Sequence, residues 1–193
     1  MNGWGLYYTP ARIMQGSPSG RATQGSFFEG LFIRSLHASG AFADALRACG
    51  FDVSQPRALY PIEVWNAALE VAWHHCYPRL DRESAYHELG RHLAQGFLQT
   101  RMGKVVEMGL PMLGPERLVT RIPSLCALDT YRYDVRVEQL GWRHYRVSFR
   151  DDPDAKPDLM AGLFEAGLRR ASSTLTATVT RRDGRDFDID LRW

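Results

Sequence analysis

The last third of the chain, residues 131–193, has apolar residues spaced two apart, whereas the earlier residues show a spacing of about 3.6. Apolar and polar residues alternate in four runs: 131–138, 144–150, 174–180 and 186–192. This alternation places the apolar side chains of a strand on one face. A strand with one apolar and one polar face is typical of an antiparallel sheet that is covered on one side only. The pattern therefore predicts four such strands.

Turn and capping residues separate these four runs. Leu140-Gly141 predicts the first turn, and Asp183-Gly184 has the composition of a two-residue hairpin turn. Between the two hairpins, we expect Asp158 to cap a helix over residues 159–171. The order in this part of the chain is therefore strand, strand, helix, strand, strand.

The polar face of the last predicted strand carries three carboxylates, Asp186, Asp188 and Asp190. Charged residues on neighbouring strands stabilise a sheet when opposite charges face one another. We expect Arg181 and Arg182, just before the second hairpin turn, and the threonines of the preceding strand to lie opposite the three carboxylates.

Residues upstream of the sheet carry helical spacing. Six segments are expected to be helical: 27–36, 41–48, 60–77, 81–101, 105–112 and 116–122. Pro61 suits a first helical turn, and Asp81 suits an N-cap. Gly90 and Gly96, beside the apolar stripe of the fourth segment, predict close helix contacts. The fold class predicted is α+β, with N-terminal helices packed on one face of a four-stranded antiparallel sheet.

The chain of 193 residues is long enough for one domain, which we place at residues 25–193. Residues 1–24 mix aromatic residues with Gly, Ser, Pro and Gln without a sustained period, which predicts a flexible N-terminal arm. The sequence has no apolar run of bilayer length and no signal peptide. It has three cysteines and no CxxC spacing, so we expect reduced thiols and a cytoplasmic protein.

The net charge of +2 is close to balance, which argues against a dedicated nucleic-acid binder. Arginine supplies nearly all of the positive charge, and Lys104 and Lys156 are the only lysines. We attribute this bias to genomic composition.

No residues stand out as a catalytic set or a metal site. His74, His75 and Cys76 are adjacent, and adjacent residues of a helix point about 100° apart, so they do not chelate one metal together. His87 and His92 lie on different helical faces. The acidic segment 151–158 lacks the glycine of a calcium loop, which favours a solvated turn. We therefore predict no catalytic residue, no metal ligand and no cofactor.

The helical segments also carry large apolar side chains at matching spacings. Ligand cavities are mostly lined by such side chains. A hydrophobic core is the first interpretation, and the wall of a ligand pocket is the second. The candidate ligand-binding residues are Phe28, Phe32, Trp65, Leu69, Trp73 and Phe97.

Five short phrases occur together in one order: GSFFEGLFIR at 25–34, YP at 60–61, HELGR at 87–91, LGPERL at 113–118 and GLFEAGL at 162–168. This order resembles a family of uncharacterised paralogous proteins of similar length that is expanded in myxobacteria. The resemblance covers residues 24–193. It brings no established activity with it.

The layout of helices followed by strand, strand, helix, strand, strand also resembles a broader fold. Haem–nitric-oxide sensor domains, 4-vinyl-reductase-type ligand domains and small subunits of a Golgi transport particle share it. The resemblance implies a small apolar or tetrapyrrole ligand, or a helical dimer interface. The haem sensors carry Tyr-x-Ser-x-Arg, but here Tyr133 replaces the serine and Val135 the arginine after Tyr131. The sequence therefore predicts no haem propionate clamp.

Three functional hypotheses follow. The first is a non-enzymatic, regulatory domain that binds a small apolar ligand between helices and sheet. The second is an interaction module without ligand, a homo-oligomer and most simply a homodimer through the helices that carry Phe28 or Trp65. The third is an enzyme that uses Cys76 or a histidine, which requires these side chains to converge in a cleft. We expect no nucleic-acid partner.

Overall fold

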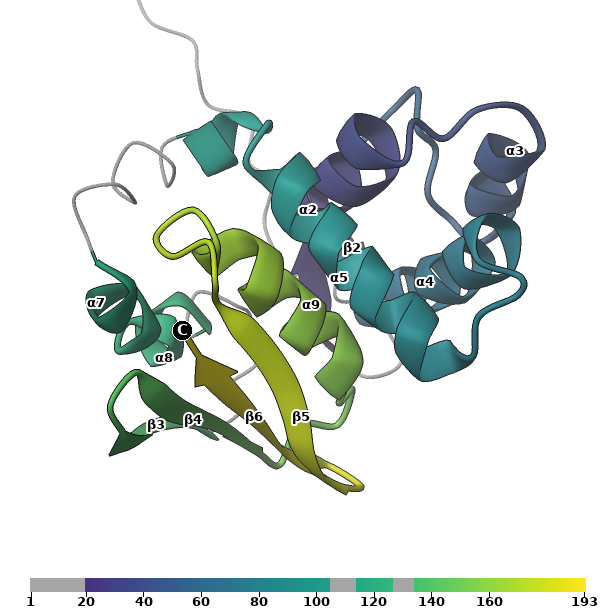
Figure 1. The fold of residues 1–193 in the computed structure, drawn as a ribbon. Coiled ribbons are helices and arrows are strands. Elements are labelled where there is room, and N and C mark those ends of the chain that lie inside the picture. Colours follow the sequence, from purple (N-terminus) through teal and green to yellow (C-terminus); the bar gives the residue numbers. More distant parts are fainter. Residues whose placement is uncertain (1–19, 105–113, 127–133) are drawn as a thin grey trace, which may run out of the picture.

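The computed structural model describes residues 20–104, 114–126 and 134–193, and Figure 1 shows how they are arranged. The predictions for residues 1–19, for segment 105–112 and for Tyr131 and Tyr133 lie outside these residues. The elements are, in order, β1 (Ala22–Gln24), α2 (Gly25–Phe28), η1 (Glu29–Ser35), α3 (Gly40–Ala48), β2 (Leu59–Pro61), α4 (Ile62–Cys76), α5 (Arg82–Phe97), α7 (Pro115–Val119), α8 (Ile122–Cys126), β3 (Asp134–Gly141), β4 (His144–Arg150), α9 (Pro157–Leu168), β5 (Thr176–Asp183) and β6 (Asp186–Arg192).

The predicted α+β class and the antiparallel sheet are confirmed. Four strands form one sheet in the order β3-β4-β6-β5, and β1 pairs with β2 in a second, two-stranded sheet. Val137 lies opposite Val147, which lies opposite Ile189, which in turn lies opposite Val179. This row of β-branched residues crosses the apolar face of the sheet, as the alternation predicts.

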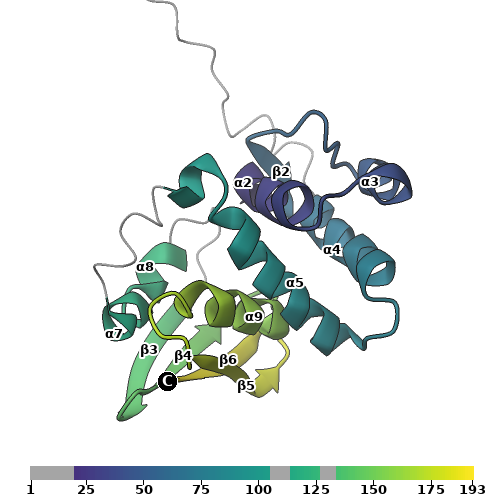
Figure 2. The same cartoon turned by 45° about the horizontal axis from the view of Figure 1, so that its top comes forward.

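The domain has two hydrophobic cores separated by a pair of helices. α9 lies on the apolar face of the sheet, and α5 lies on α9, farther from the sheet (Figures 1 and 2). Phe164 of α9 and Leu118 of α7 belong to the sheet core. Phe28 and Trp65 belong to the other core, which lies among the N-terminal helices. Most of the N-terminal helices therefore pack on the sheet indirectly, through α5 and α9.

Glycines allow α5 to approach its two neighbours closely. A Cβ added at Gly90 would lie 2.1 Å from a backbone oxygen of α9, and one at Gly162 would lie 1.9 Å from a backbone oxygen of α5. On the other side, a Cβ at Gly96 would lie 1.8 Å from a backbone oxygen of η1. The close contacts predicted at Gly90 and Gly96 are confirmed, and they place helix backbones in direct contact.

The helix predicted over residues 27–36 is present but changes type along its length. α2 continues into η1, a π-helix in which the Leu36 amide donates to the carbonyl oxygen of Leu31 at 2.9 Å. A π-helix closes hydrogen bonds over five residues instead of four, and it is rare outside functional or strained positions.

Three local features differ from the predictions. Ala22–Gln24, which the sequence places in the N-terminal arm, forms β1. Pro61 ends β2 and is the N-cap of α4 instead of lying in its first turn. The first hairpin turns at Trp142 and Arg143, where Arg143 has a φ of 52°, and not at Leu140-Gly141.

The polar face of the sheet carries two buried carboxylates. Asp190 is only 6% exposed; it accepts a hydrogen bond from Arg146 Nε at 2.8 Å and lies 2.9 Å from His144 Nε2. Asp188 is 7% exposed, and its Oδ1 lies 2.7 Å from Arg150 Nη2. The two groups form an ion pair, but their angles do not meet the criteria of a hydrogen bond. His144, Arg146 and Arg150 all lie on β4. Of the partners predicted on β5, Arg181 lies 3.9 Å from Asp186 and Thr180 donates to Asp190, whereas Arg182 pairs with Asp158.

Candidate functional site

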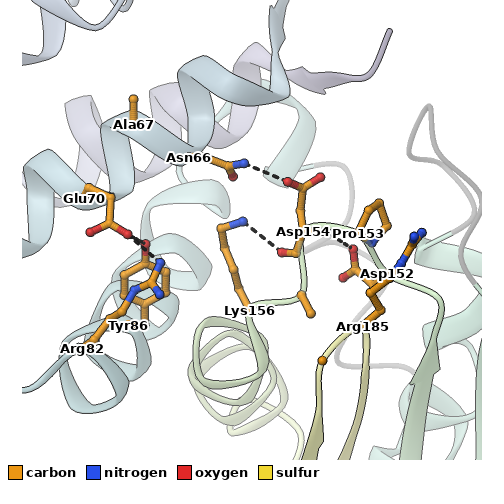
Figure 3. A pocket seen from close by; sticks show the side chains of 12 residues that line it. Asn66, Ala67, Glu70, Arg82, Tyr86, Asp152, Pro153, Asp154, Lys156 and Arg185 are labelled. Carbon is orange, nitrogen blue, oxygen red and sulfur yellow. Dashed lines mark hydrogen bonds and ion pairs between the residues drawn. The ribbon is translucent and has the colours of Figure 1, made fainter. Parts of the chain in front are cut away.

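A polar pocket of about 420 Å³ lies where α4 and α5 meet the segment that leads into α9 (Figure 3). We call it the Lys156 pocket. Its lining residues come from α4, from the start of α5, from the segment before α9 and from the β5–β6 turn: Asn66, Ala67, Glu70, Arg82, Tyr86, Asp152, Pro153, Asp154, Ala155, Lys156, Gly184 and Arg185. The volume lies within the range of about 300–1,000 Å³ that is usual for small-molecule sites.

The helical wall of the pocket is an ordered polar cluster. Asn66 and Glu70 lie one turn apart on α4, so both face the pocket side of that helix. One carboxylate oxygen of Glu70 accepts hydrogen bonds from Arg82 Nη2 at 2.6 Å and from the Tyr86 hydroxyl at 2.8 Å. The pKa of Tyr86 is raised to about 12: burial is the main cause, Arg82 opposes it, and Glu70 adds to it. Tyr86 therefore remains a hydrogen-bond donor near neutral pH.

The segment before α9 forms the opposite wall, where the sequence predicts a solvated turn. The Asp154 amide donates to Asp152 Oδ1 at 2.9 Å, and the Asp152 amide donates to the carbonyl oxygen of Arg185 at 3.0 Å. Asp154 Oδ1 accepts a hydrogen bond from Asn66 Nδ2 at 2.8 Å, and Arg21 forms an ion pair with the other oxygen of Asp154. This side of the pocket is therefore held to α4 and to the N-terminal residues.

Lys156 lies between the two walls (Figure 3). It is the N-cap of α9, and Pro157 takes the first helical position, where the missing N–H of proline costs no hydrogen bond. Asp158, which the sequence predicts as the cap, lies in the first turn instead. Lys156 Nζ donates to the backbone oxygen of Asp154 at 2.9 Å. The pKa of Lys156 is lowered to about 8: burial is the main cause, Asp152 opposes it, and Arg82 adds to it.

This lowered pKa predicts that Lys156 destabilises the fold at neutral pH. The pKa of about 8 lies below the ordinary lysine value of 10.5, so the unfolded chain binds more protons than the folded chain between these two pH values. The free energy of unfolding should therefore rise as the pH increases through this window. We expect Lys156→Met to stabilise the protein at pH 7 by about 1–2 kcal/mol, with a smaller gain at pH 9.5.

Urea unfolding at the two pH values measures this effect. Lys104→Met is the matched control, because Lys104 is exposed and is the other lysine of the chain. A loss of stability in Lys156→Met at pH 7 would show instead that the amine supports the fold.

The structure brings together four of the six predicted ligand-binding residues in the helical core. Phe28, Phe32 and Leu69 have no exposed surface, and Trp65 is 6% exposed. The rings of Phe28 and Phe32 lie 5.0 Å and 5.9 Å from that of Trp65. These side chains fill the space among the N-terminal helices.

The other two predicted residues lie at the edge of this cluster. Trp73 is half-buried, and its Nε1 donates to the backbone oxygen of Leu80 at 3.0 Å. Phe97 is also half-buried and packs on Phe27 with ring centroids 5.4 Å apart. None of the six residues lines the Lys156 pocket.

The histidines and cysteine that the enzyme hypothesis requires lie in separate environments. His74 stacks on Trp73, and His75 stacks on Phe42; both histidines are exposed. Burial raises the pKa of Cys76, which disfavours a thiolate nucleophile. Among the described residues, no group of three His, Cys, Asp or Glu side chains has a metal-binding arrangement.

Sequence reasoning missed the residues of the Lys156 pocket. The acidic segment 151–158 was noted only as a solvated turn, and Asn66, Glu70 and Arg82 were not singled out. One signal was present: Lys156 is one of two lysines in a chain that otherwise uses arginine. An amine at that position, next to four nearby aspartates, is unusual enough to mark it for inspection.

The sequence matches a family model over residues 21–193 that is described as "Protein of unknown function (DUF2378)". The chain belongs to the DUF2378 family. This confirms the predicted membership of a family of uncharacterised proteins. No curated protein matches the chain.

Solved H-NOX structures share the fold of this DUF2378 protein. An H-NOX protein from S. oneidensis superposes with a TM-score of 0.67 at 12% identity, over 88% of this chain and 95% of that one. An H-NOX mutant from T. tengcongensis gives a TM-score of 0.65 at 11% identity, over 88% and 97%. The predicted likeness to haem sensor domains is thus confirmed at the level of the fold. Within the described residues, no helix is long and apolar enough to cross a bilayer.

The described residues do not fit a haem group. Haem iron needs an axial ligand that faces an open pocket, most often a histidine. α5 carries His87 and His92, but it touches both neighbouring helices at glycine positions that do not admit even a methyl group. His92 Nδ1 also lies 2.7 Å from the Ser35 hydroxyl. Val135, at the arginine position of the haem motif, packs on the sheet core.

Proposed function

We propose that this domain is a non-catalytic regulatory domain that binds a small ligand in the Lys156 pocket. The observation that carries this proposal is the composition of the pocket: its walls come from the N-terminal helices and from the part of the chain that contains the sheet, and the amine of Lys156 lies between them. A ligand in this position would contact α4 and α5 on one side and the segment leading into α9 on the other. A bound ligand would then favour one relative placement of these elements over others. Such a difference in affinity between conformations is what a regulatory response requires.

The similar solved structures support ligand binding as a use of this fold. Their descriptions concern heme redox potential, heme distortion and H-NOX activation. Because the sequence identity is only 10%, the likeness to these proteins extends to the fold alone. The ligand must therefore be argued from the residues of this chain.

Two predictions from the sequence stay as alternatives. An apolar ligand between Phe28, Phe32 and Trp65 would require these side chains to move apart, because their rings are in contact. A homo-oligomer that uses α2 or α4 would have to use their outer faces, because Phe28 and Trp65 point inward.

A screen by nuclear magnetic resonance distinguishes these sites. ¹⁵N-labelled protein would be titrated with a library that contains small polar metabolites and medium-chain fatty acids. We expect polar compounds to shift the amide signals of Asn66, Tyr86 and Lys156. The proposal fails if no compound shifts these signals, and shifts confined to Phe28, Phe32 and Trp65 would favour the apolar site.

A further inference from the structure

The amine of Lys156 has unused hydrogen-bonding capacity. An ammonium group has three donors, and the one hydrogen bond described for Lys156 Nζ is to the backbone oxygen of Asp154. Among the ion pairs of the described residues, none involves Lys156, whereas Arg21, Arg82 and Arg185 each have a carboxylate partner. Asp152 favours the charged amine electrostatically, but no carboxylate of the described residues lies within ion-pair distance of it, so an added anion would further stabilise this half-buried cation.

Asn66 leaves a second group unsatisfied in the same pocket. Its Nδ2 donates to Asp154 Oδ1 at 2.8 Å, while its Oδ1 is buried and has no donor among the described residues. A flipped amide would place two acceptor oxygens against each other, so the hydrogen-bond network fixes this orientation. A buried acceptor without a donor costs about 1–3 kcal/mol.

The two unsatisfied groups belong to side chains that both contact Asp154. Figure 3 shows the side chains of Lys156 and Asn66 both directed towards Asp154, one to its backbone oxygen and the other to its carboxylate. One group lacks an acceptor and the other lacks a donor. A single small molecule that carries both would satisfy them together.

From this complementarity we infer that the Lys156 pocket takes a small organic anion that also carries a hydroxyl or amino group. The anionic oxygens would pair with Lys156, and the hydroxyl or amino group would donate to Asn66 Oδ1. This inference rests on the proposed function and specifies its ligand class.

The charges around the pocket favour an anion over a cation. Of its three carboxylates, Glu70 accepts from Arg82 and Tyr86, Asp154 pairs with Arg21, and Asp152 accepts from the Asp154 amide and interacts electrostatically with Lys156. Lys156 is also the N-cap of α9, and the N-terminus of a helix carries partial positive charge. A cationic ligand would have to compete with cations that are already in place.

Binding should be linked to proton uptake by Lys156. The charged groups around it are Arg21 beside β1, Glu70 on α4, Arg82 on α5, Asp152 and Asp154 in the preceding segment and Arg185 in the β5–β6 turn. An anion in contact with the amine raises its pKa above about 8, because it favours the charged form. The affinity should therefore fall as the pH rises through 8.

The inference is tested with matched pairs of probes. Malate differs from succinate by one hydroxyl, and glycerol 3-phosphate differs from propyl phosphate by two. The two pairs separate carboxylate from phosphate ligands. One additional hydrogen bond of about 1 kcal/mol corresponds to roughly fivefold in affinity, so we expect a hydroxylated probe to bind about fivefold more tightly than its partner. Labelling lysine with ¹⁵N at the ε-amine gives two side-chain signals, which report Lys156 and, as an internal control, Lys104.

Two variants separate the roles of the two side chains. Lys156→Met should weaken binding of the hydroxylated probe about tenfold or more, since it removes a charged hydrogen bond. Asn66→Ala should abolish the preference for the hydroxylated member of each pair, and Lys104→Met should change neither. For the unmodified protein, the affinity at pH 9.5 should be lower than at pH 7.

The outcomes distinguish this inference from the proposed function. If both members of a pair bind equally, or if Lys156→Met binds as tightly as the unmodified chain, the inference is wrong. If none of these probes binds but other library compounds shift the pocket signals, the inference is wrong and the proposed function stands. If no compound reaches the pocket, both are wrong.

Discussion

Gly162→Ala is expected to destabilise the protein by about 3 kcal/mol or more, even though alanine is the better helix former. The added Cβ would lie 1.9 Å from the carbonyl oxygen of His87 and 3.1 Å from the backbone nitrogen of Arg91. Both are backbone atoms of α5, so no side-chain rotation relieves the clash. The two helices would have to separate.

The same helix provides the control. A Cβ added at Gly167, five residues later in α9, meets only the Cβ of Ala94 at 4.0 Å, which is ordinary van der Waals contact. Gly167→Ala should therefore leave the stability within about 0.5 kcal/mol or raise it, because it removes the flexibility of glycine from a helix. Urea unfolding of the two variants gives the comparison. Equal stabilities would show that the backbone contact between α5 and α9 does not hold the two cores together.

Gly90 makes the reciprocal contact. A Cβ there would lie 2.1 Å from the carbonyl oxygen of Leu159. Once one alanine has forced the two helices apart, the Cβ of the second alanine meets the facing backbone at a longer distance. The double variant Gly90→Ala/Gly162→Ala should therefore lose less stability than the sum of the two single losses.

The sequence predicts the sheet well because the pattern that indicates a strand lies within a few consecutive residues. Alternation of apolar and polar residues decides which side of a strand is buried, and each run carries this pattern within a few residues. Val147 and Ile189 are completely buried, as their positions in the pattern require. The close contacts at Gly90 and Gly96 are likewise predictable, since a glycine beside an apolar helical stripe indicates a close neighbour. The sequence does not indicate which helix that neighbour is.

The partners of the buried carboxylates on the sheet could not be predicted in the same way. Asp190 faces the polar side of β6, as the alternation indicates, but its partner depends on which strand lies next to it. β6 lies between β4 and β5, and Arg146 of β4 lies directly opposite Asp190. A register shift in β5 between Val179 and Arg181 alters the positions of the arginines that the sequence favours. Strand order is a property of the whole fold.

The candidate site was missed for a related reason. Its residues lie at 66–86, 152–156 and 184–185, and each group is ordinary in its local context. The six apolar residues attracted attention instead because aromatic side chains at helical spacing form a visible local pattern. That pattern is equally typical of a hydrophobic core and of the wall of an apolar pocket. Only the packing of α4 and α5 against the segment before α9 brings Asn66 and Lys156 together.

Asp190→Asn is the second substitution with a large expected effect. Arg146 donates to both oxygens of Asp190, at 2.8 Å and 3.2 Å, and His144 and Thr180 also contact this carboxylate. An amide in its place removes the negative charge and points donors at Arg146. Breaking a buried pair costs about 3–5 kcal/mol, and because the Arg146 side chain is 35% exposed we expect about 2–3 kcal/mol.

The acid limb of the stability curve provides an independent measurement. Burial alone would raise the pKa of Asp190, but the hydrogen bonds from Arg146 and His144 lower it overall. A folded-state pKa below the unfolded value of 3.8 means that Asp190 contributes its full stability above that pH. This contribution is lost as the pH falls through the folded pKa. Asp190→Asn should therefore flatten the decline in stability below about pH 4.

Two further variants separate the buried pair from general charge effects. Asp44→Asn removes a carboxylate that lies 2.9 Å from Arg47 but is 68% exposed, so it should change stability by less than about 0.5 kcal/mol. In an Arg146→Met background, Asp190→Asn should lose less stability, because the guanidinium left without a partner is absent. If the loss is the same in both backgrounds, Asp190 stabilises the sheet through His144 and Thr180 instead of Arg146.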